Sequence, residues 1–158
     1  MSSSKTDNDR SRIHELSEPR FIATSFTSDL LVAKNRRVIE LMNERNYTSP
    51  FFDCIATDLE IDLHGHRLIG LKGFVEGYKA VADASPGLHV KITNASGIVD
   101  EALQSGTVIL HVILSSYYDT TSRLATERAS TILSCWTREN DRWLVYSYKM
   151  YCGIQAVP

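Results

Sequence analysis

The residues best suited to proton chemistry lie mostly in the C-terminal half of the chain, on segments whose pattern predicts strands. His89 can serve as a general base or acid, because an imidazole titrates near neutral pH. Glu127 can accept a proton from carbon or oxygen if burial raises the pKa of its carboxyl group. Tyr118 and Tyr148 can donate hydrogen bonds to a developing enolate or alkoxide. Asn43, on a predicted helix, can orient a carbonyl group, so these residues are the catalytic candidates.

Each candidate also has a structural interpretation. His89 can hydrogen-bond a backbone carbonyl at the start of a strand, and Glu127 can be a solvated charge at the rim of a pocket. Tyr118 and Tyr148 can be ordinary core residues, since aromatic side chains are common in strands. Asn43 can cap the end of a helix. The direction in which the side chains point decides between the two interpretations.

A pocket is predicted if His89 faces inward, because every second residue of the neighbouring strands then faces inward with it. The resulting lining is mostly apolar with a few polar groups, the usual composition of a small-molecule site. Besides the catalytic candidates, the expected substrate-binding residues are Leu63, Phe74, Tyr78, Leu114, Thr131, Leu133, Tyr146 and Met150.

The elements that position these residues follow from the apolar spacing. In chain order, helices and strands are predicted at 28–46, from Pro50, and at 57–64, 71–84, 88–99, 106–119, 124–138 and 142–152. Gly65 and Gly70 bracket a predicted turn. Helices followed by long antiparallel strands indicate one α+β domain over 27–152. A polar tail or arm is expected at 1–26 and a short C-terminal tail at 153–158.

The strand predicted at 106–119 is apolar on both of its faces. One face carries aliphatic residues from Val108 to Leu114, and the other carries Ile109 and Ile113. Helices can cover only one face of a sheet of this size, so the outer face needs another cover. We predict a homodimer through the outer sheet face. The alternative is that the N-terminal arm covers this face.

Composition excludes several classes of partner. The chain has 158 residues and a formal net charge of −2, and its basic residues are scattered, which argues against nucleic acid. No apolar run is long enough to span a membrane, so no membrane partner is expected. The first residues contain no apolar signal core, and the 3 cysteines have no paired spacing. These features predict reduced thiols and a cytoplasmic location.

No metal or cofactor is expected from the motifs. Asp58, Glu60, Asp62 and His64 alternate with Leu59, Ile61 and Leu63, so the acidic cluster is interpreted as a solvated strand face. His64-Gly65-His66 has too few partners for a metal site. The sequence has no glycine-rich nucleotide fingerprint, no phosphate-binding loop and no nucleophile elbow.

Several stretches resemble the NTF2-like superfamily, cone-shaped α+β domains that include the SnoaL-like polyketide cyclases and scytalone dehydratase. Phe51–Leu63 (FFDCIATDLEIDL) resembles the short helix that runs into the family's first strand. Gly73–Val90 (GFVEGYKAVADASPGLHV) resembles the SnoaL-like helix and its Pro-containing break. Trp136–Tyr146 (WTRENDRWLVY) resembles the final hairpin. The resemblance spans 27–152 and implies a curved antiparallel sheet wrapped around N-terminal helices, with an internal pocket.

The resemblance to scytalone dehydratase is partial when taken position by position. His89 matches the pocket histidine that follows the second long helix, whereas Leu63 stands in place of a strand tyrosine. The dehydratase residues are also absent from the remaining matched positions, Tyr118, Thr131, Leu133 and Asn43-Glu44. The resemblance therefore implies the location of the pocket. This chain resembles more closely the SnoaL-like proteins of secondary metabolism, which include cofactor-independent cyclases and isomerases.

The sequence thus predicts a cofactor-independent enzyme that acts on a hydrophobic, oxygenated small molecule of secondary-metabolite biosynthesis. The expected reaction is proton transfer coupled to cyclisation, isomerisation or rearrangement, with dehydration as an alternative. A second hypothesis is a non-catalytic small-molecule-binding or dimerisation module on the same fold. An inward histidine together with an inward acid favours the enzyme, and their absence from the inner face favours the module.

Overall fold

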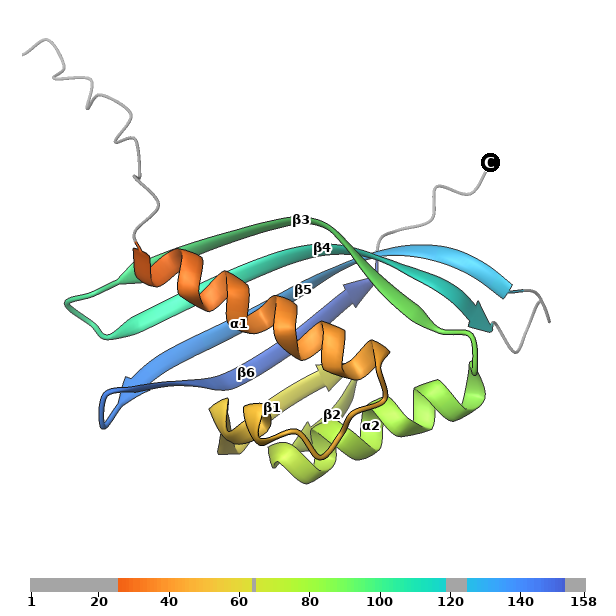
Figure 1. Cartoon of the computed structure of the whole chain (residues 1–158), viewed down its shortest axis with the longest axis horizontal. Helices are drawn as coiled ribbons and strands as arrows, with labels where there is room; N and C mark the ends of the chain where they lie inside the picture. Colours follow the sequence, from red (N-terminus) through yellow and green to blue (C-terminus); the bar gives the residue numbers. More distant parts are fainter. Residues whose placement is uncertain (1–25, 64, 119–124, 153–158) are drawn as a thin grey trace, which may run out of the picture.

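Two long helices and a curved sheet make up the part of the chain that the structure describes (Figure 1). This computed structural model describes residues 26–63, 65–118 and 125–152. The elements are α1 (Phe26–Asn43), the short 3₁₀ helix η1 (Pro50–Cys54), β1 (Ile55–Leu63), β2 (His66–Ile69), α2 (Gly70–Ala84), β3 (His89–Asp100), β4 (Ser105–Tyr118), β5 (Ala125–Glu139) and β6 (Arg142–Cys152). The predicted α+β class is therefore confirmed.

The sheet differs from the predicted antiparallel sheet in one strand pair. Its order is β2-β1-β6-β5-β4-β3, and β1 pairs with β6 in parallel while the other neighbours are antiparallel. Parallel neighbours need a long connection between them, and here α2 and four strands separate β1 from β6 along the chain. The sheet is therefore mixed.

The turn predicted between Gly65 and Gly70 contains a short strand. His66–Ile69 forms β2, which pairs antiparallel with the end of β1. Gly65 adopts a positive φ of 86°, and its amide donates to the Asp62 side chain at 2.8 Å, which closes the hairpin. A strand this short carries too little alternation to stand out from a turn.

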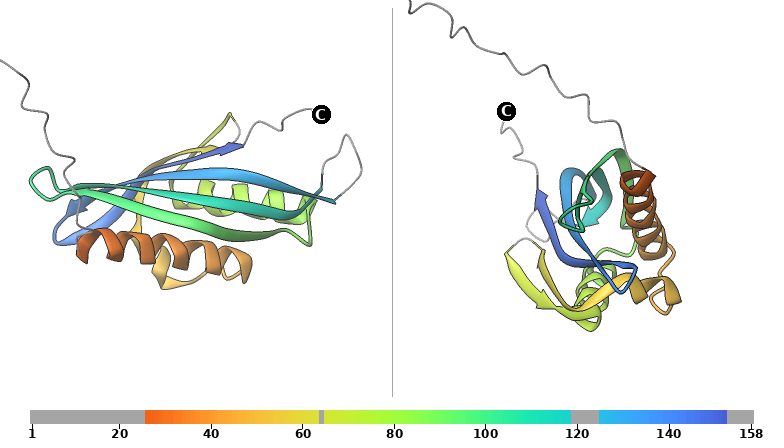
Figure 2. Two further views of the ribbon diagram at one scale, coloured as in Figure 1. Left: turned by 90° about the horizontal axis from the view of Figure 1, so that it is seen from above. Right: turned by 90° about the vertical axis from the view of Figure 1, so that its left-hand side faces the viewer.

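Both helices lie on the concave side of the twisted sheet (Figure 2). α1 packs on β3 and β4, and α2 packs on β1 and β2. The close approach of α1 depends on Gly97, where an added Cβ would lie 2.7 Å from the Ser28 hydroxyl. The same hydroxyl donates to the Gly97 carbonyl at 2.8 Å. The missing side chain at Gly97 thus lets the first turn of α1 contact the backbone of β3.

A buried polar chain fixes α1 on the middle of the sheet. The Trp136 indole donates to the Ser134 hydroxyl at 3.0 Å, and that hydroxyl donates to the Asn35 amide oxygen at 2.9 Å. The Asn35 amide nitrogen donates to the Leu31 carbonyl at 3.1 Å. Buried polar groups that are hydrogen-bonded in this way specify one register of the helix on the sheet.

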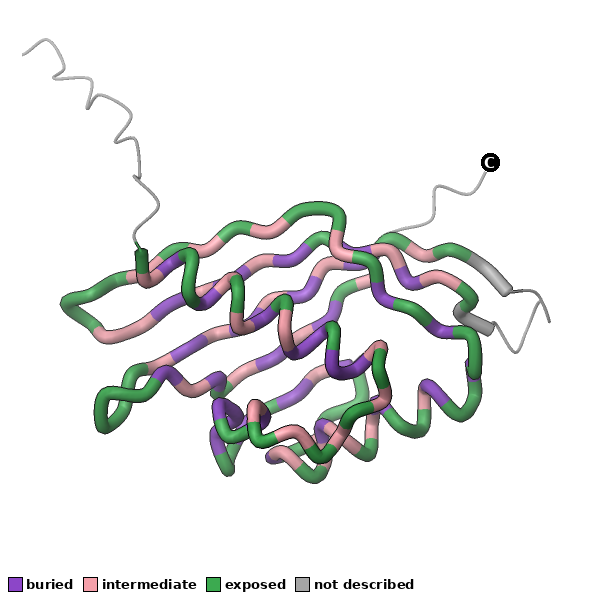
Figure 3. Tube along the Cα trace, in the orientation of Figure 1, coloured by how far each residue is buried: buried purple, intermediate pink, exposed green. Residues whose placement is uncertain are grey.

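Burial alternates along the strands and defines an inner and an outer face (Figure 3). On β4, the inner face carries the buried side chains of Val108, Leu110, Val112 and Leu114. Ile109 and Ile113 lie on the outer face and are half-buried, so the predicted two-faced pattern is confirmed. Within the described residues, no helix is long and apolar enough to cross a membrane.

Candidate functional site

An apolar cavity lies between α2 and the inner face of the sheet. We call it the inner cavity, and its lining residues are Leu63, Tyr78, Val81, Leu88, Val90, Leu114 and Met150. Its free volume is about 30 Å³, which is room for about one water molecule. The lining joins the end of β1, the second half of α2, the start of β3 and the ends of β4 and β6, all at one end of the domain.

Local sequence explains why these side chains converge. Phe74 and Tyr78 are four residues apart on α2 and Val81 follows three later, so all three fall on one helix face. Leu63 and Met150 are register partners on β1 and β6, so they share the inner face. The helix face and the sheet face are therefore both apolar where they meet.

Two hydrogen-bonded tyrosines are buried at the inner cavity, and one of them, Tyr78, belongs to its lining. The hydroxyls of Tyr78 and Tyr148 lie 2.9 Å apart, and these residues are only 6% and 2% exposed. The Phe74 ring packs on both, with centroids 5.1 Å from Tyr78 and 5.2 Å from Tyr148. This packing fixes the rings and holds the two hydroxyls together.

Both tyrosines are neutral at physiological pH. Burial raises the pKa of Tyr78 from 10.0 to about 12, and the hydrogen bond with Tyr148 lowers it in part. Burial raises the pKa of Tyr148 well above 10.0, and the neighbouring Tyr78 raises it further. The pair therefore acts through neutral hydroxyls, which can donate or accept a hydrogen bond.

Several side chains lie where the sequence analysis expects them. Leu63, Tyr78, Leu114 and Met150 line the inner cavity, while Phe74 and Tyr148 are buried beside it. Their inward orientation is confirmed. Their roles in binding or catalysis stay predictions.

The inward orientation predicted for His89 is wrong. His89 is exposed, while its neighbours Leu88 and Val90 are buried and line the inner cavity. Val90 pairs with Leu114 on the inner face, which places His89 on the opposite side of β3. The His89 ring therefore faces away from the cavity.

On β5, as on β3, the residues that face inward are the neighbours of those predicted to do so. Ile132 and Trp136 are buried and set its inner face, so Glu127, Thr131 and Leu133 point outward. Glu127 is exposed, and the Thr131 hydroxyl lies 3.3 Å from the His111 ring on the outer face. Their inward orientation is a wrong prediction, because both faces of this strand carry apolar residues and alternation leaves the choice open.

Tyr146 is also on the outer side, with 43% of its surface exposed. The register of β5 and β6 shifts between the pairs Cys135↔Ser147 and Trp136↔Val145, which leaves Tyr146 as the extra residue of a β-bulge. A bulge reverses the direction of every later side chain. Trp143 and Val145 therefore face inward before it, and Tyr148 faces inward after it.

Asn43 serves the backbone of β3. Its amide nitrogen donates to the Val90 carbonyl at 2.9 Å, and its amide oxygen accepts from the Val90 amide at 2.8 Å. This arrangement joins the end of α1 to the start of β3, which is a structural role but not the helix cap considered above. Tyr118 ends β4, and its side chain lies outside the part of the chain that the structure describes.

The structure adds inner-face residues that sequence reasoning missed. Ser130 is buried, and its hydroxyl lies 3.9 Å from the Cys152 sulfur. Arg128 shares this face by register, opposite Leu114. The one signal in the sequence is Trp136, the bulkiest apolar residue of β5, which falls in the same phase as Arg128 and Ser130; Leu133 in the other phase offsets it.

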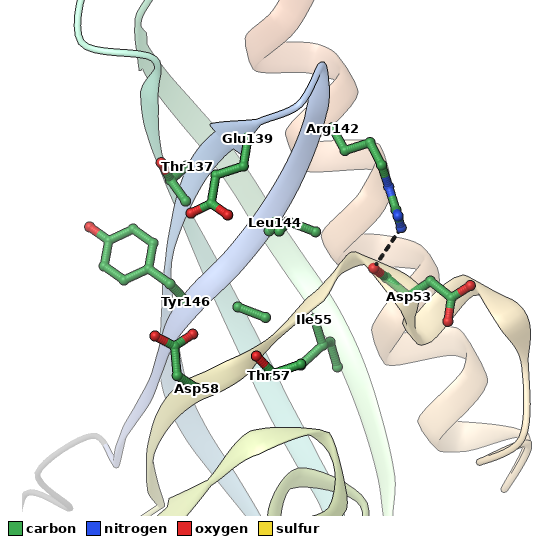
Figure 4. A pocket seen from close by; sticks show the side chains of 10 residues that line it. Asp53, Ile55, Thr57, Asp58, Thr137, Glu139, Arg142, Leu144 and Tyr146 are labelled. Atoms are coloured by element: carbon green, nitrogen blue, oxygen red, sulfur yellow. Dashed lines mark hydrogen bonds between the residues drawn. The ribbon is translucent and has the colours of Figure 1, made fainter.

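A second, larger depression lies on the outer side of the sheet (Figure 4). This outer groove has a volume of about 700 Å³ and is lined by Asp53, Ile55, Ala56, Thr57, Asp58, Thr137, Glu139, Arg142, Leu144 and Tyr146. Arg142 donates to the Asp53 carbonyl at 3.0 Å across it. The groove is wide, open to water and lined by a mixture of polar and apolar groups, whereas the inner cavity is small, less open and apolar. The apolar lining favours the inner cavity for a hydrophobic ligand, but its free volume is far below that of a typical ligand pocket, so a ligand must displace lining side chains to enter.

Metal chemistry has little support within the described part of the chain. No group of three or more His, Cys, Asp or Glu side chains there has the geometry to hold a metal ion. Of the described residues that line the inner cavity, Tyr78 alone has a polar side chain. The arrangement can therefore hold an apolar molecule and hydrogen-bond one of its polar atoms.

Comparison with protein-family models finds no match, and comparison with curated proteins also finds none. Solved structures do match. An uncharacterised protein with a cystatin-like fold from Caulobacter vibrioides aligns with a TM-score of 0.70 at 11% identity, over 80% of this chain and 89% of that one. An NTF2-like superfamily protein from Salmonella enterica aligns with a TM-score of 0.66 at 10% identity, over 86% and 100%.

The protein Aln2 from a Streptomyces species is also similar, with a TM-score of 0.60 at 10% identity over 77% of this chain and 87% of that one. Sequence identities this low establish a shared fold but say nothing about activity. The helices on the concave side, the curved six-stranded sheet and these alignments agree. The chain therefore has the NTF2-like, cystatin-like fold.

Proposed function

We propose that the chain is a cofactor-independent enzyme of small-molecule biosynthesis, in secondary metabolism, with a hydrophobic oxygenated substrate. The observation that carries the proposal is the apolar inner cavity, lined by Tyr78, with the neutral Tyr78–Tyr148 pair buried beside it. An apolar lining excludes water and favours one conformer of a flexible substrate. Hydroxyl donors can stabilise charge that develops on a substrate oxygen.

The proposed reaction is cyclisation, isomerisation or rearrangement. These reactions conserve the atoms of the substrate, so no co-reactant is required. His89 and Glu127 do not supply proton transfer in this reaction, because both side chains are exposed. Catalysis instead rests on conformer selection and on hydrogen bonds to oxygen. Arg128, on the inner face by register, adds a positive charge at that end of the sheet.

A non-catalytic small-molecule-binding module is the second candidate. The observation that favours it is the same outward orientation of His89 and Glu127, because a binding module needs no acid or base in its cavity. Both candidates use the same inner cavity. The enzyme would convert the bound molecule, whereas the binding module would release it unchanged.

One experiment separates the candidates. The full-length protein is incubated with a metabolite extract from the source organism lacking this gene, and the products are followed by mass spectrometry. Isomerisation or cyclisation converts one compound to another of equal mass, whereas dehydration removes one water. A compound that co-purifies with the protein unchanged supports the binding module. Absence of both conversion and retention contradicts the proposal.

A pair of variants ties the activity to the inner cavity. Val81→Phe fills the cavity from a half-buried position, and Leu103→Phe adds the same side chain at an exposed turn. We expect Val81→Phe to lower conversion by at least about tenfold, because a displaced substrate loses its reactive geometry. Leu103→Phe should leave it unchanged. Equal activity of the two variants contradicts the assignment of the site.

We also propose a homodimer through the outer sheet face and a cytoplasmic location. Support for the dimer comes from the apolar outer residues Ile109, Ile113 and Leu133, which the helices leave uncovered, and from the exposed Ile98 and Tyr151. Support for the location comes from the cysteines, none of which forms a disulfide within the described residues.

A further inference from the structure

A third depression lies between α1, the short helix η1 and the turn that joins β5 to β6. We call it the hairpin groove, and its lining includes Leu30, Lys34, Phe51, Cys54, Arg142 and Trp143. Its volume is about 360 Å³, within the range of small-molecule sites, and it is partly open to water. None of its described lining residues belongs to the inner cavity, so the two sites are separate.

One part of the hairpin groove is apolar. Phe51 on η1 and Trp143 on β6 contribute aromatic surface, and Leu30 on α1 adds an aliphatic side chain that is 38% exposed. An apolar ligand that covers these side chains removes their surface from water, which favours binding. Aromatic ligands gain further from packing against other rings. This part of the groove therefore favours a ligand with an aromatic ring.

Two cations of the lining lack a carboxylate partner. The Lys34 ammonium lies 5.5 Å from the centre of the Phe51 ring, on a half-buried side chain. Arg142 donates to the Asp53 carbonyl at 3.0 Å, which is a neutral acceptor, and points away from the carboxylate of its register partner Glu139 (Figure 4). Among the described residues, no carboxylate forms an ion pair with Lys34 or Arg142.

The carboxylates of the lining do not cancel these charges. Asp141 pairs with Arg138 at 3.1 Å, and its side chain is 93% exposed, so its charge is already compensated. Asp53 is exposed and forms no ion pair within the described residues. Lys34 and Arg142 together therefore leave one positive charge in excess of Asp53.

The two cations act on a common point of the groove, the Cys54 thiol. Burial raises the pKa of Cys54, while Lys34 and Arg142 each lower it in part and the neighbouring Asp53 raises it. The charges on α1 and on β6 therefore reach the same part of the lining. A carboxylate placed there can interact with both, because Arg142 has donors beyond the one that binds the Asp53 carbonyl.

We propose that the hairpin groove binds a small aromatic carboxylate, with its ring against Phe51 and Trp143 and its carboxylate at Lys34 and Arg142. This is a second binding site, apart from the inner cavity and from the proposed reaction. The excess of positive charge disfavours a cationic ligand, and a neutral ligand leaves both cations unpaired. The groove therefore selects acids over amides and amines of the same shape.

The test uses three naphthalene probes, substituted at the same carbon, with the full-length protein at low ionic strength. Naphthoate carries a carboxylate, naphthamide a neutral amide, and naphthylmethylammonium a positive charge. Binding is followed by NMR through the indole N–H signals of Trp136 and Trp143, the 2 tryptophans of the chain. We expect naphthoate to shift the Trp143 signal, to bind about fivefold to tenfold more tightly than naphthamide, and to weaken as salt is added. The ammonium probe should not bind.

Matched variants test the two cations. Lys34→Gln should weaken naphthoate binding by about threefold or more, because it removes a charge at the site. Arg36→Gln removes an exposed charge of the same helix outside the groove and should change binding by less than about twofold. Arg142→Gln should also weaken binding, and Arg142→Lys, which keeps the charge, should retain most of it. Near-ultraviolet circular dichroism confirms folding, and the affinity for naphthamide should stay unchanged in all four variants.

Equal binding of naphthoate and naphthamide to wild type overturns the proposal, because charge then plays no part. Equal losses in Lys34→Gln and Arg36→Gln also overturn it, since the attraction is then general to the protein surface. Shifts of the Leu114 and Met150 methyl signals without a shift of Trp143 place the acid in the inner cavity, which overturns the hairpin groove as its site and supports the proposed function. Failure of naphthoate to bind overturns the site and leaves the proposed function intact.

Discussion

At the scale of single residues, the buried tyrosine pair is the feature that most needs explanation. An apolar core of this size can be filled by phenylalanine, and Phe74 already packs against both rings. Two hydroxyls that share one hydrogen bond add a donor with no described acceptor. Proteins tend to retain such groups where function requires them.

The stability of tyrosine variants tests this view. Tyr78→Phe leaves the Tyr148 hydroxyl buried without a partner, so we expect the free energy of unfolding to fall by about 1–2 kcal/mol. The double variant Tyr78→Phe/Tyr148→Phe removes both hydroxyls and should recover most of that loss. Urea unfolding followed by circular dichroism measures both values. If the double variant instead loses more stability than Tyr78→Phe alone, each hydroxyl has a hydrogen-bond partner of its own, which contradicts this view.

The tyrosine pair also predicts a pH dependence. The pKa of Tyr78 is raised by folding from 10.0 to about 12, so the neutral form is favoured in the folded state. The resulting stability is fully present below pH 10 and is lost as the pH rises towards about 12. Wild type should therefore lose stability more steeply over this range than the double phenylalanine variant. Parallel pH profiles of the two proteins would contradict the assignment.

At the scale of helices and strands, sequence reasoning predicted the elements but not always their faces. Leu31, Val38, Leu41 and Met42 on α1 and Leu59, Ile61 and Leu63 on β1 are buried as expected, because each pattern contrasts apolar with polar positions. On β5, both phases contain apolar residues, so the pattern leaves the inner face undecided. The bulge at Tyr146 changes the phase again, and local sequence gives no sign of it.

The candidate site was therefore predictable only in part. Side chains from α2 and from the ends of β1, β4 and β6 were placed correctly, whereas His89 and Glu127 were not. Register with a neighbouring strand determines which face a residue occupies, and that pairing is non-local. The parallel pairing of β1 with β6 was missed for the same reason.

The contact between α1 and β3 gives a prediction at this scale. Gly97→Ala places a Cβ 2.7 Å from the Ser28 hydroxyl and 3.1 Å from the Ser28 backbone oxygen, so the helix must shift. We expect a loss of about 1–3 kcal/mol in the free energy of unfolding. Ser96→Ala, the exposed neighbouring position, is the control and should change it by less than about 0.5 kcal/mol. Equal stability of the two variants would show that α1 adapts to the larger side chain.

At the scale of the whole molecule, the sheet buries one face and leaves the other open. Helices cover the concave face, while Ile109, Ile113 and Leu133 on the outer face are only half-buried. Exposed apolar patches of this kind are typical of interfaces between protein chains. A symmetric dimer would cover the patch with its own copy.

The oligomeric state tests the outer face. Wild type should sediment as a dimer at micromolar concentration, and Ile109→Asp should sediment as a monomer, because a charge would be buried in the interface. Leu103→Asp, in an exposed turn, is the matched control and should remain dimeric. A wild-type monomer at this concentration would contradict the proposed dimer.

The central claim is that the ligands of the proposed function bind in the inner cavity and not in the outer groove. Methyl-selective NMR during titration with the compound that the protein converts or retains tests it directly, because the two sites have different methyl groups. We predict that the methyl signals of Leu63, Val81, Leu88, Leu114 and Met150 shift with one common affinity. Shifts confined to Ile55 and Leu144, which line the outer groove, would contradict the account.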